Sequence, residues 1–390
     1  MRYGRAFVMA GTCVLLAGAS GAQGALPVKL PEGFTPRPVE LRLDTPKGRA
    51  DDVRDDALAR ASVWAPPAVP PGSVDLSANP GPFPDPTICR FQPSEPSGAT
   101  PKFDCVFEGG EVLKVKYGSE EVHSEAVASR LLSALGFGAD RIYLVRTLRC
   151  FGCRFDPYTQ ADNKNLPADY GTFVDFHNVA VERRLPGKAI EGDSSVGWSW
   201  EELDKAQAEG RGSSRAERDA LRLMAVLLNN WDNRKENQRL LCLPEGYPPQ
   251  PGGHCGKAIA YMHDVGGTFG RVAGSWNRVR GKGKEERKLD VEAWRRVPIW
   301  KDRAACKVDI KSPRLHGATF DPSVISEPGR RLLADLLAQV RPEQMQALFD
   351  GALVEHQADA KPASADASAW AAVLQEKVRQ ITEGAPCPTL

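Results

Sequence analysis

Residues 229–237 read Asn-Asn-Trp-Asp-Asn-Arg-Lys-Glu-Asn, and this polar stretch is the strongest indication of the fold. It follows apolar residues at helical spacing in 221–228 and precedes a strand-like run in 238–243. An apolar helix would therefore deliver a loop that carries Asp232 and, five residues later, Asn237. A carboxylate can accept the proton of a hydroxyl group, and an amide oxygen binds a metal ion without adding charge. The alternative is a polar helix end, in which Asp232 is a cap and Asn237 lies in a turn.

A second cluster follows the apolar run 258–262. Asp264 lies two residues after this run and is followed by the glycine-rich residues 265–270. Glycines permit a sharp turn that takes the chain away from the aspartate, whose carboxylate then becomes a candidate metal ligand. The alternative is an ordinary strand exit with Asp264 in an Asx turn.

A third cluster carries positive charge. Residues 112–117 alternate as a strand, which places Lys114 and Lys116 on one face. A helix is predicted over 119–136, with Glu125 in its middle. A lysine fixed by a nearby glutamate is suited to binding nucleotide phosphates. The alternative is a strand face that is simply solvated.

A small-residue loop precedes the lysine strand. Two strands are predicted at 88–91 and 103–107, and between them residues 97–102 read Ser-Gly-Ala-Thr-Pro-Lys. Backbone N–H groups of such a loop can approach phosphate oxygens closely. Gly98 and Lys102 are therefore candidate phosphate-binding residues.

The order of these clusters resembles the protein-kinase-like superfamily. A lysine strand, a glutamate helix, a D-x-x-x-x-N loop, a strand pair and the D-x-G of 264–266 follow one another as in that superfamily. Residues 97–102 resemble the S-G-x-x-P-K segment of HipA-type kinases. The chain is also similar in style to secretory-pathway kinases of the Golgi casein kinase type and to secreted bacterial proteins of this architecture. The resemblance covers about residues 88–350 and rests on motifs.

The resemblance implies an α+β, bilobal protein-kinase-like fold with a small β-rich N-lobe and a mainly helical C-lobe. It further implies an ATP site with Mg²⁺ or Mn²⁺. The implied roles are as follows: Lys116 or Lys114 positions ATP, Glu125 holds that lysine, Asp232 is the catalytic aspartate, Arg234 steadies the transferring phosphoryl group, and Asn237 and Asp264 bind the metal.

The chain also departs from the protein-kinase pattern. It has no G-x-G-x-x-G loop, and Trp231 rather than His-Arg precedes the aspartate. The expected hinge is the strand 178–183, including Glu182, whose backbone would meet an adenine edge. The alternative for this strand is plain core structure.

Composition limits the function classes. The net charge of +1 argues against a dedicated nucleic-acid binder. No stretch reaches the roughly 18 uninterrupted apolar residues of a membrane span. Residues 1–24 have the layout of a signal peptide, with Arg2 and Arg5 ahead of a short apolar run and small residues at the cleavage positions. We therefore expect a secreted or periplasmic protein. Separately, we expect a monomer.

Cleavage after residue 24 would leave eight of the nine cysteines, and export favours disulfides. Cys242 and Cys255 flank a Pro/Gly-rich loop and are the best local pair. Cys89 and Cys105 are a second candidate pair. Cys150 and Cys153 form a CxxC that is open to three readings: a redox motif, half of a zinc site or a local disulfide.

The expected domains are a proline-rich extended arm over 25–86, an N-lobe over 87–177 and a C-lobe over 178–390 that ends in helices. A short helix is possible at 51–62 within the arm. Residues after Gly270 are basic and would hold an activation or substrate-binding segment.

The leading prediction is transfer of a phosphoryl group from Mg-ATP to the hydroxyl of a protein or small molecule. A periplasm contains little ATP, so two alternatives stay open. One is a non-catalytic kinase-fold binding module, and the other is a kinase-fold nucleotidyl transferase.

Overall fold

The computed structural model describes residues 41–77, 81–94, 98, 100–158, 169, 171–208, 211–248, 252–270, 289–310, 320, 323–357 and 361–388. The predicted signal peptide, the start of the predicted arm and the basic residues 271–288 lie outside these ranges. Helices and strands are mixed along the described chain, in keeping with the predicted α+β class.

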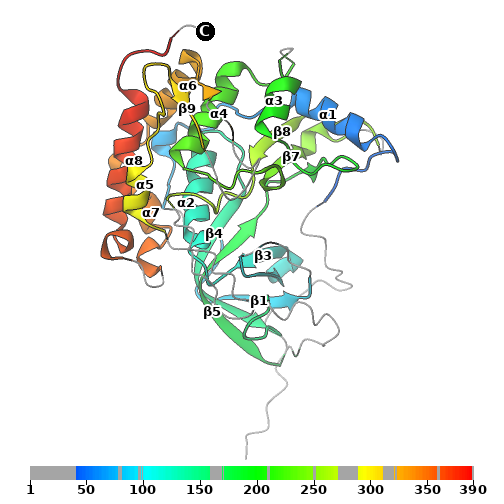
Figure 1. Ribbon diagram of the computed structural model, residues 1–390. Coiled ribbons are helices and arrows are strands. Elements are labelled where there is room, and N and C mark those ends of the chain that lie inside the picture. Colours follow the sequence, from blue (N-terminus) through cyan, green and yellow to red (C-terminus); the bar gives the residue numbers. More distant parts are fainter. Residues whose placement is uncertain are drawn as a thin grey trace, which may run out of the picture.

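A small barrel forms from five strands, which lie below the helices in Figure 1. The strands are β1 (Thr87–Gln92), β2 (Lys102–Val106), β3 (Val112–Lys116), β4 (Arg141–Phe151) and β5 (Phe173–Arg183). They close in the order β1-β2-β3-β5-β4, with neighbours antiparallel except for the parallel pair β1–β4. The bounds of β1, β2 and β3 agree closely with the predicted strands, because each alternates inward and outward residues.

Aromatic, aliphatic and cysteine side chains fill the barrel. Cys89–Cys105 and Cys150–Cys153 are disulfides, and sulfur atoms of Cys105 and Cys150 lie 3.7 Å apart. The predicted pairs Cys89–Cys105 and Cys242–Cys255 are confirmed, the CxxC is a local disulfide, and Cys306–Cys387 is a further one.

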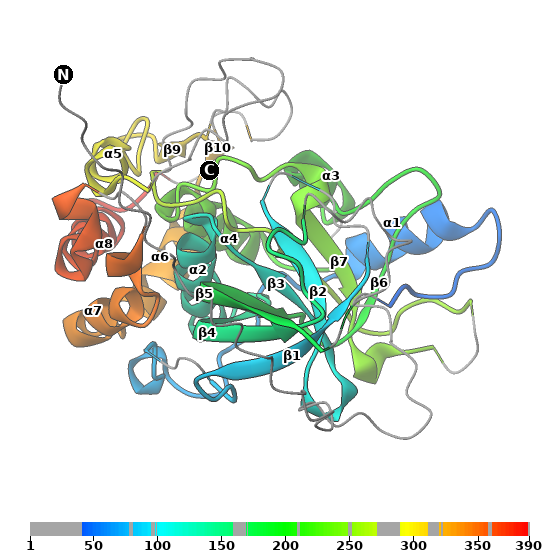
Figure 2. The same ribbon diagram turned by 90° about the horizontal axis from the view of Figure 1, so that it is seen from below.

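A mainly helical part packs against the barrel and contains the rest of the described chain. Its longer helices are α2 (Glu121–Ala134), α4 (Arg215–Leu227), α6 (Glu327–Leu337), α7 (Pro342–Asp350) and α8 (Ala367–Thr382). Shorter helices are α3 (Trp200–Ala206) and α5 (Val291–Arg296), and the strands are β6 (Lys188–Ala189), β7 (Gln238–Cys242), β8 (Ala258–Met262), β9 (Lys307–Val308) and β10 (Ser323–Val324). Strands β6, β7 and β8 make one antiparallel sheet, and β9 pairs with β10. Figure 2, seen from below, places α7 and α8 on one side of the barrel and α1 (Ala50–Arg60) on the other.

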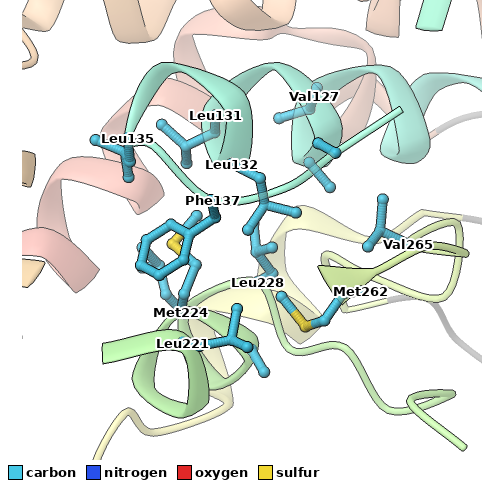
Figure 3. Packing of buried hydrophobic residues seen from close by; sticks show 14 of the residues in the cluster. Val127, Leu131, Leu132, Leu135, Phe137, Leu221, Met224, Leu228, Met262 and Val265 are labelled. Atoms are coloured by element: carbon cyan, nitrogen blue, oxygen red, sulfur yellow. The ribbon is translucent and has the colours of Figure 1, made fainter. Parts of the chain in front are cut away.

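The central core of the helical part joins α2 to α4. Ser214 and Glu217 form a capping box that begins α4, and apolar residues at helical spacing then face α2. Figure 3 shows Leu131 and Leu132 of α2, and Leu135 just after it, across from Leu221, Met224 and Leu228, with Phe137 in the same layer. Met262 and Val265 belong to this cluster, so the core supports both ends of the segment that carries Asp264.

The predicted extended arm is wrong for residues 50–60, which pack on the helical part. Residues 50–60 form α1, which contacts β8 and α3, and Val53, Ala57 and Leu58 are buried. Their helical spacing gives α1 an apolar side that can leave water only by packing on the helical part. The possible short helix at 51–62 is therefore present, as a packed element.

The expected hinge is also corrected. Strand β5 runs to Arg183, through the predicted boundary between 177 and 178. Residues 180–182 pair with β3 on one edge and β4 on the other, so both backbone edges are engaged in the sheet. They cannot offer free backbone groups to an adenine ring, and the chain leaves the barrel only after Arg183.

Candidate functional site

A buried ion pair joins the barrel to α2. Lys116 ends β3, and its Nζ donates to Glu125 Oε1 at 2.6 Å and to Oε2 at 2.8 Å. The two side chains are only 4% and 2% exposed. Helix α2 begins five residues after Lys116, so Glu125 lies one turn into a helix that packs beside the strand. The predicted lysine–glutamate pair is thus formed by Lys116.

Glu182 places a second carboxylate beside the same ammonium. Its Oε2 lies 3.3 Å from Lys116 Nζ, and its Oε1 lies 3.7 Å from Lys114 Nζ and 3.2 Å from Arg184 Nε. Burial would raise the pKa of Glu182, but these three cations hold it well below its usual value. Glu182 is therefore ionised and holds the two lysine ammonium groups in place. The adenine contact expected of its strand is not its role.

Asp264 faces this cluster from the end of β8. Burial opposes its charge, yet Lys116, His263 and Lys102 lower the pKa of Asp264 to about 2. In return, Glu125, Asp264 and Glu182 hold the pKa of Lys116 well above its usual value, against the effect of burial. The lysine strand and the D-x-G turn therefore interact electrostatically.

Asx geometry is present at Asp264 as well. The backbone N–H of Gly266 donates to Asp264 Oδ1 at 3.3 Å, which is the local turn considered as the alternative. This turn orients the carboxylate and leaves it directed toward charged neighbours, so the two interpretations are compatible.

The loop 231–237 is tied to the residues around Asp264. Asn237 Nδ2 donates to the Asp232 carbonyl at 2.7 Å, and the Asn237 carbonyl accepts from the N–H groups of His263 and Asp264, both at 3.0 Å. Arg234 Nε lies 3.5 Å from Asp232 Oδ1. These bonds bring Asp232, Asn237 and Asp264 together, and they orient the Asn237 amide so that Oδ1 is its remaining ligand atom.

Lys102 is the first residue of β2, and Gly98 lies in the loop between β1 and β2. Lys102 is the register partner of Lys116 across β2 and β3 and contributes to the low pKa of Asp264. Gly98 is exposed and has a positive φ of 94°. Ser97 and Ala99, the other small residues of the predicted phosphate loop, lie outside the described residues.

Glu121 is a site residue that the motifs did not indicate. It is 6% exposed and accepts a hydrogen bond from Thr100 Oγ1. Gly266 lies so close that a Cβ there would overlap the Glu121 side chain. The small-residue loop, the start of α2 and the D-x-G turn therefore meet at this carboxylate. The signal in the sequence is its position four residues before Glu125, on the same helix face.

The assembled groups fit a phosphate ester with a divalent cation. Lys116 and Lys102 are cations beside an ionised Asp264, and the Asn237 amide offers an oxygen that adds no charge. Lys114 Nζ lies 3.7 Å from Glu182, and its register partner on β2 is Asp104. Burial and the nearby Arg184 lower the pKa of Lys114 despite Glu182. The geometry thus separates the two candidate lysines, because only Lys116 reaches Glu125.

Comparisons with known proteins give little beyond this geometry. No protein-family model and no curated protein matches the chain. Among solved structures, the chain is similar to the proinflammatory kinase CtkA of Helicobacter pylori, with 10% sequence identity and a TM-score of 0.38. The match covers 75% of this chain and 94% of that one, and it assigns no residue here.

Proposed function

We propose that the chain is a bilobal kinase-like enzyme that transfers a phosphoryl group from Mg-ATP to a hydroxyl group of a protein or small molecule. The observation that carries this proposal is the buried Lys116, held by Glu125 and Glu182 and facing the ionised Asp264. In this proposal, the barrel would be the small lobe and the helical part the large lobe. Two buried carboxylates and a partly buried third around one lysine are costly unless they are retained for a ligand or a fixed geometry.

Each residue has a role that follows from its surroundings. Lys116 and Lys102 would neutralise phosphate oxygens, and Asp264 and the Asn237 amide would hold Mg²⁺ or Mn²⁺. Asp232 would orient the acceptor hydroxyl and take its proton, and Arg234, 3.5 Å from Asp232, would steady negative charge on the phosphoryl group. Bound magnesium would supply charge neutralisation between phosphates.

We further propose an extracytoplasmic location. The four disulfides among the described residues support an oxidising compartment, because such bonds are rare where thiols are kept reduced. Among the described residues, no helix combines the length and the apolar composition that crossing a bilayer needs.

The proposal is tested with radiolabelled ATP. The purified chain is incubated with Mg²⁺, dephosphorylated casein as a generic hydroxyl acceptor, and ATP labelled at the γ- or the α-phosphate. We expect label from the γ-position on casein or on the chain itself, and a loss of at least about 100-fold in Asp232→Asn.

The matched control is Asp175→Asn. Asp175 pairs with Arg149 on the outside of the barrel at 2.8 Å, away from the site, and its substitution should leave transfer unchanged. Transfer of the α-label would show nucleotidyl transfer instead. Saturable nucleotide binding without any transfer would show a non-catalytic binding module.

A further inference from the structure

The carboxylate of Asp140 is buried where three segments of the chain meet. It is 4% exposed and accepts three hydrogen bonds: from Leu185 N–H at 2.7 Å, from the Tyr261 hydroxyl at 3.1 Å and from His263 Nδ1 at 2.5 Å. Burial raises the pKa of Asp140, but His263 outweighs it and the pKa is lowered. An ionised carboxylate can only accept, so Nδ1 of His263 carries the proton.

The three donors come from the segments that build the candidate site. Leu185 follows β5 and belongs to the chain that leaves the barrel. Tyr261 and His263 share one face of the segment that reaches Asp264 at the next residue. Asp140 itself lies between α2, which carries Glu125, and β4. One carboxylate therefore connects the exit from the barrel, the strand of the metal ligand and the helix of the lysine's partner.

The turn that presents Asp140 is fixed against the helical part. Trp64 Nε1 donates to the Leu135 carbonyl at 2.8 Å. A Cβ at Gly138 would lie 2.7 Å from Tyr261 Cβ, so this glycine is what allows the turn to touch β8. The turn that carries Asp140 is therefore held by Trp64 and β8 where the Asp140 carboxylate contacts Leu185 after the barrel.

A chain of charges continues from Asp140 to the lysine. Arg184, next to Leu185, lies 3.2 Å from Glu182, which in turn lies 3.3 Å from Lys116. Asp140, Glu182 and His263 are close enough to suggest a metal centre, with ligand atoms within 4.8 Å of one another. Arg184 and Lys116 already neutralise Glu182, and His263 Nδ1 holds a proton toward Asp140, so the three residues form a network of ion pairs and one hydrogen bond.

We propose that Asp140 is a positioning residue, which sets the distance between Lys116 and Asp264 by joining the barrel exit to β8. This inference rests on the proposed function, since it concerns the alignment of phosphate and metal groups. Asp140 touches neither, and acts through Leu185, Tyr261 and His263.

The test uses Asp140→Asn in the full chain, with Asp175→Asn as the matched control. We expect the Mg²⁺ concentration needed for half-maximal transfer to rise about tenfold and kcat to fall by a similar factor. The affinity for ATP without metal should stay within about twofold, because the lysine cluster is intact. An equal loss of metal-free and metal-dependent binding would indicate a structural role only and would overturn the proposal.

Tyr261→Phe keeps the test decisive if Asp140→Asn does not fold. It removes one of the three hydrogen bonds without burying a new polar group, and we expect a rise of about twofold to threefold in the Mg²⁺ requirement. The proposal is overturned if Tyr261→Phe keeps the wild-type Mg²⁺ dependence and Asp140→Asn either keeps it as well or does not fold.

Hydrogen exchange separates this inference from the proposed function. Without any ligand, peptides covering 184–188 and 262–268 should exchange faster in Asp140→Asn, while peptides from α8 should not change. If the wild type fails to bind Mg-ATP but Asp140→Asn shows this exchange pattern relative to the wild type, the proposed function fails and the coupling through Asp140 stands. Unchanged exchange in both peptides would overturn the coupling itself.

Discussion

Strand β3 has two faces with opposite chemistry, and each face carries at least one buried side chain. Leu113 and Val115 point into the barrel and are 4% and 0% exposed, among apolar neighbours. Lys116, on the other face, is just as buried, but its neighbours are Glu125, Glu182 and Asp264. Burial alone therefore does not tell the two faces apart. The apolar face stabilises the barrel, whereas the charged face is stable only as a complete set.

The largest effect should come from removing the cation of the charged face. Lys116→Met leaves Glu125 and Glu182 without their shared partner, and we expect the free energy of unfolding to fall by about 3–5 kcal/mol. Mg-ATP binding should be lost together with it. Urea unfolding at pH 7 and equilibrium binding measure the two effects.

Lys116→Met with Glu125→Gln is the control for this prediction. Removing one of the stranded carboxylates should restore at least about half of the lost stability, without restoring nucleotide binding. Equal stability of Lys116→Met and the wild type would show that the charged face is not a coupled set.

The apolar face should give a loss of stability alone. Leu113→Ala leaves a cavity in the barrel, and we expect a cost of about 2–4 kcal/mol in urea unfolding. The affinity of the folded variant for Mg-ATP should remain within about twofold of the wild type. A larger loss of affinity would mean that the two faces are not independent.

Helix α2 extends the comparison, because it carries Glu125 toward Lys116 and His123 toward the turn that follows α7. His123 Nδ1 lies 2.7 Å from the Ala352 carbonyl oxygen, which can only accept, so Nδ1 carries a proton and donates this hydrogen bond. Burial lowers the pKa of His123 to about 4. The unfolded chain, with a pKa near 6.5, therefore binds the proton more readily, and stability must fall as the pH drops from about 6.5 toward 4.

Between pH 7 and pH 5 this histidine should account for a loss of about 2 kcal/mol, measured by urea unfolding at both values. His123→Gln provides the control, since an amide does not titrate and the loss should shrink by that amount. The same pH dependence in the variant would contradict the assignment.

The smallest effect is expected from the second lysine of the charged face. Lys114 is 20% exposed and lies 3.7 Å from Glu182, beyond hydrogen-bonding distance. Lys114→Met should cost about 1 kcal/mol or less, and Mg-ATP binding should persist. A loss of binding as large as in Lys116→Met would reverse the assignment of the two lysines.

The sequence was informative where the signal is local. Alternation in 112–117 predicts the strand and the shared face of its lysines, and the structure confirms both. Helical periodicity predicts α2, and Pro/Gly-rich spacing predicts the Cys242–Cys255 disulfide. These features depend on neighbouring residues only, which is why a single chain reveals them.

Long-range contacts account for what the sequence did not reveal. The parallel pairing of β1 with β4 closes the barrel across more than fifty residues, and no local pattern encodes it. Glu182 appeared as part of a strand, while its role comes from Lys116 and Arg184, brought to it by sheet register and the chain exit. Proline content suggested an extended arm. The apolar residues of α1 stabilise a packed helix only because β8, which is distant in the sequence, contacts them.

The most direct test is equilibrium binding of ATP to the purified chain, with and without Mg²⁺, for the wild type and Asp264→Asn. The arrangement of Lys116, Glu125 and Asp264 predicts saturable binding that Mg²⁺ strengthens in the wild type. In Asp264→Asn, the strengthening by Mg²⁺ should fall by at least about tenfold, while the fold persists. No saturable binding by the folded wild type, or the same response to Mg²⁺ in both proteins, would contradict the account.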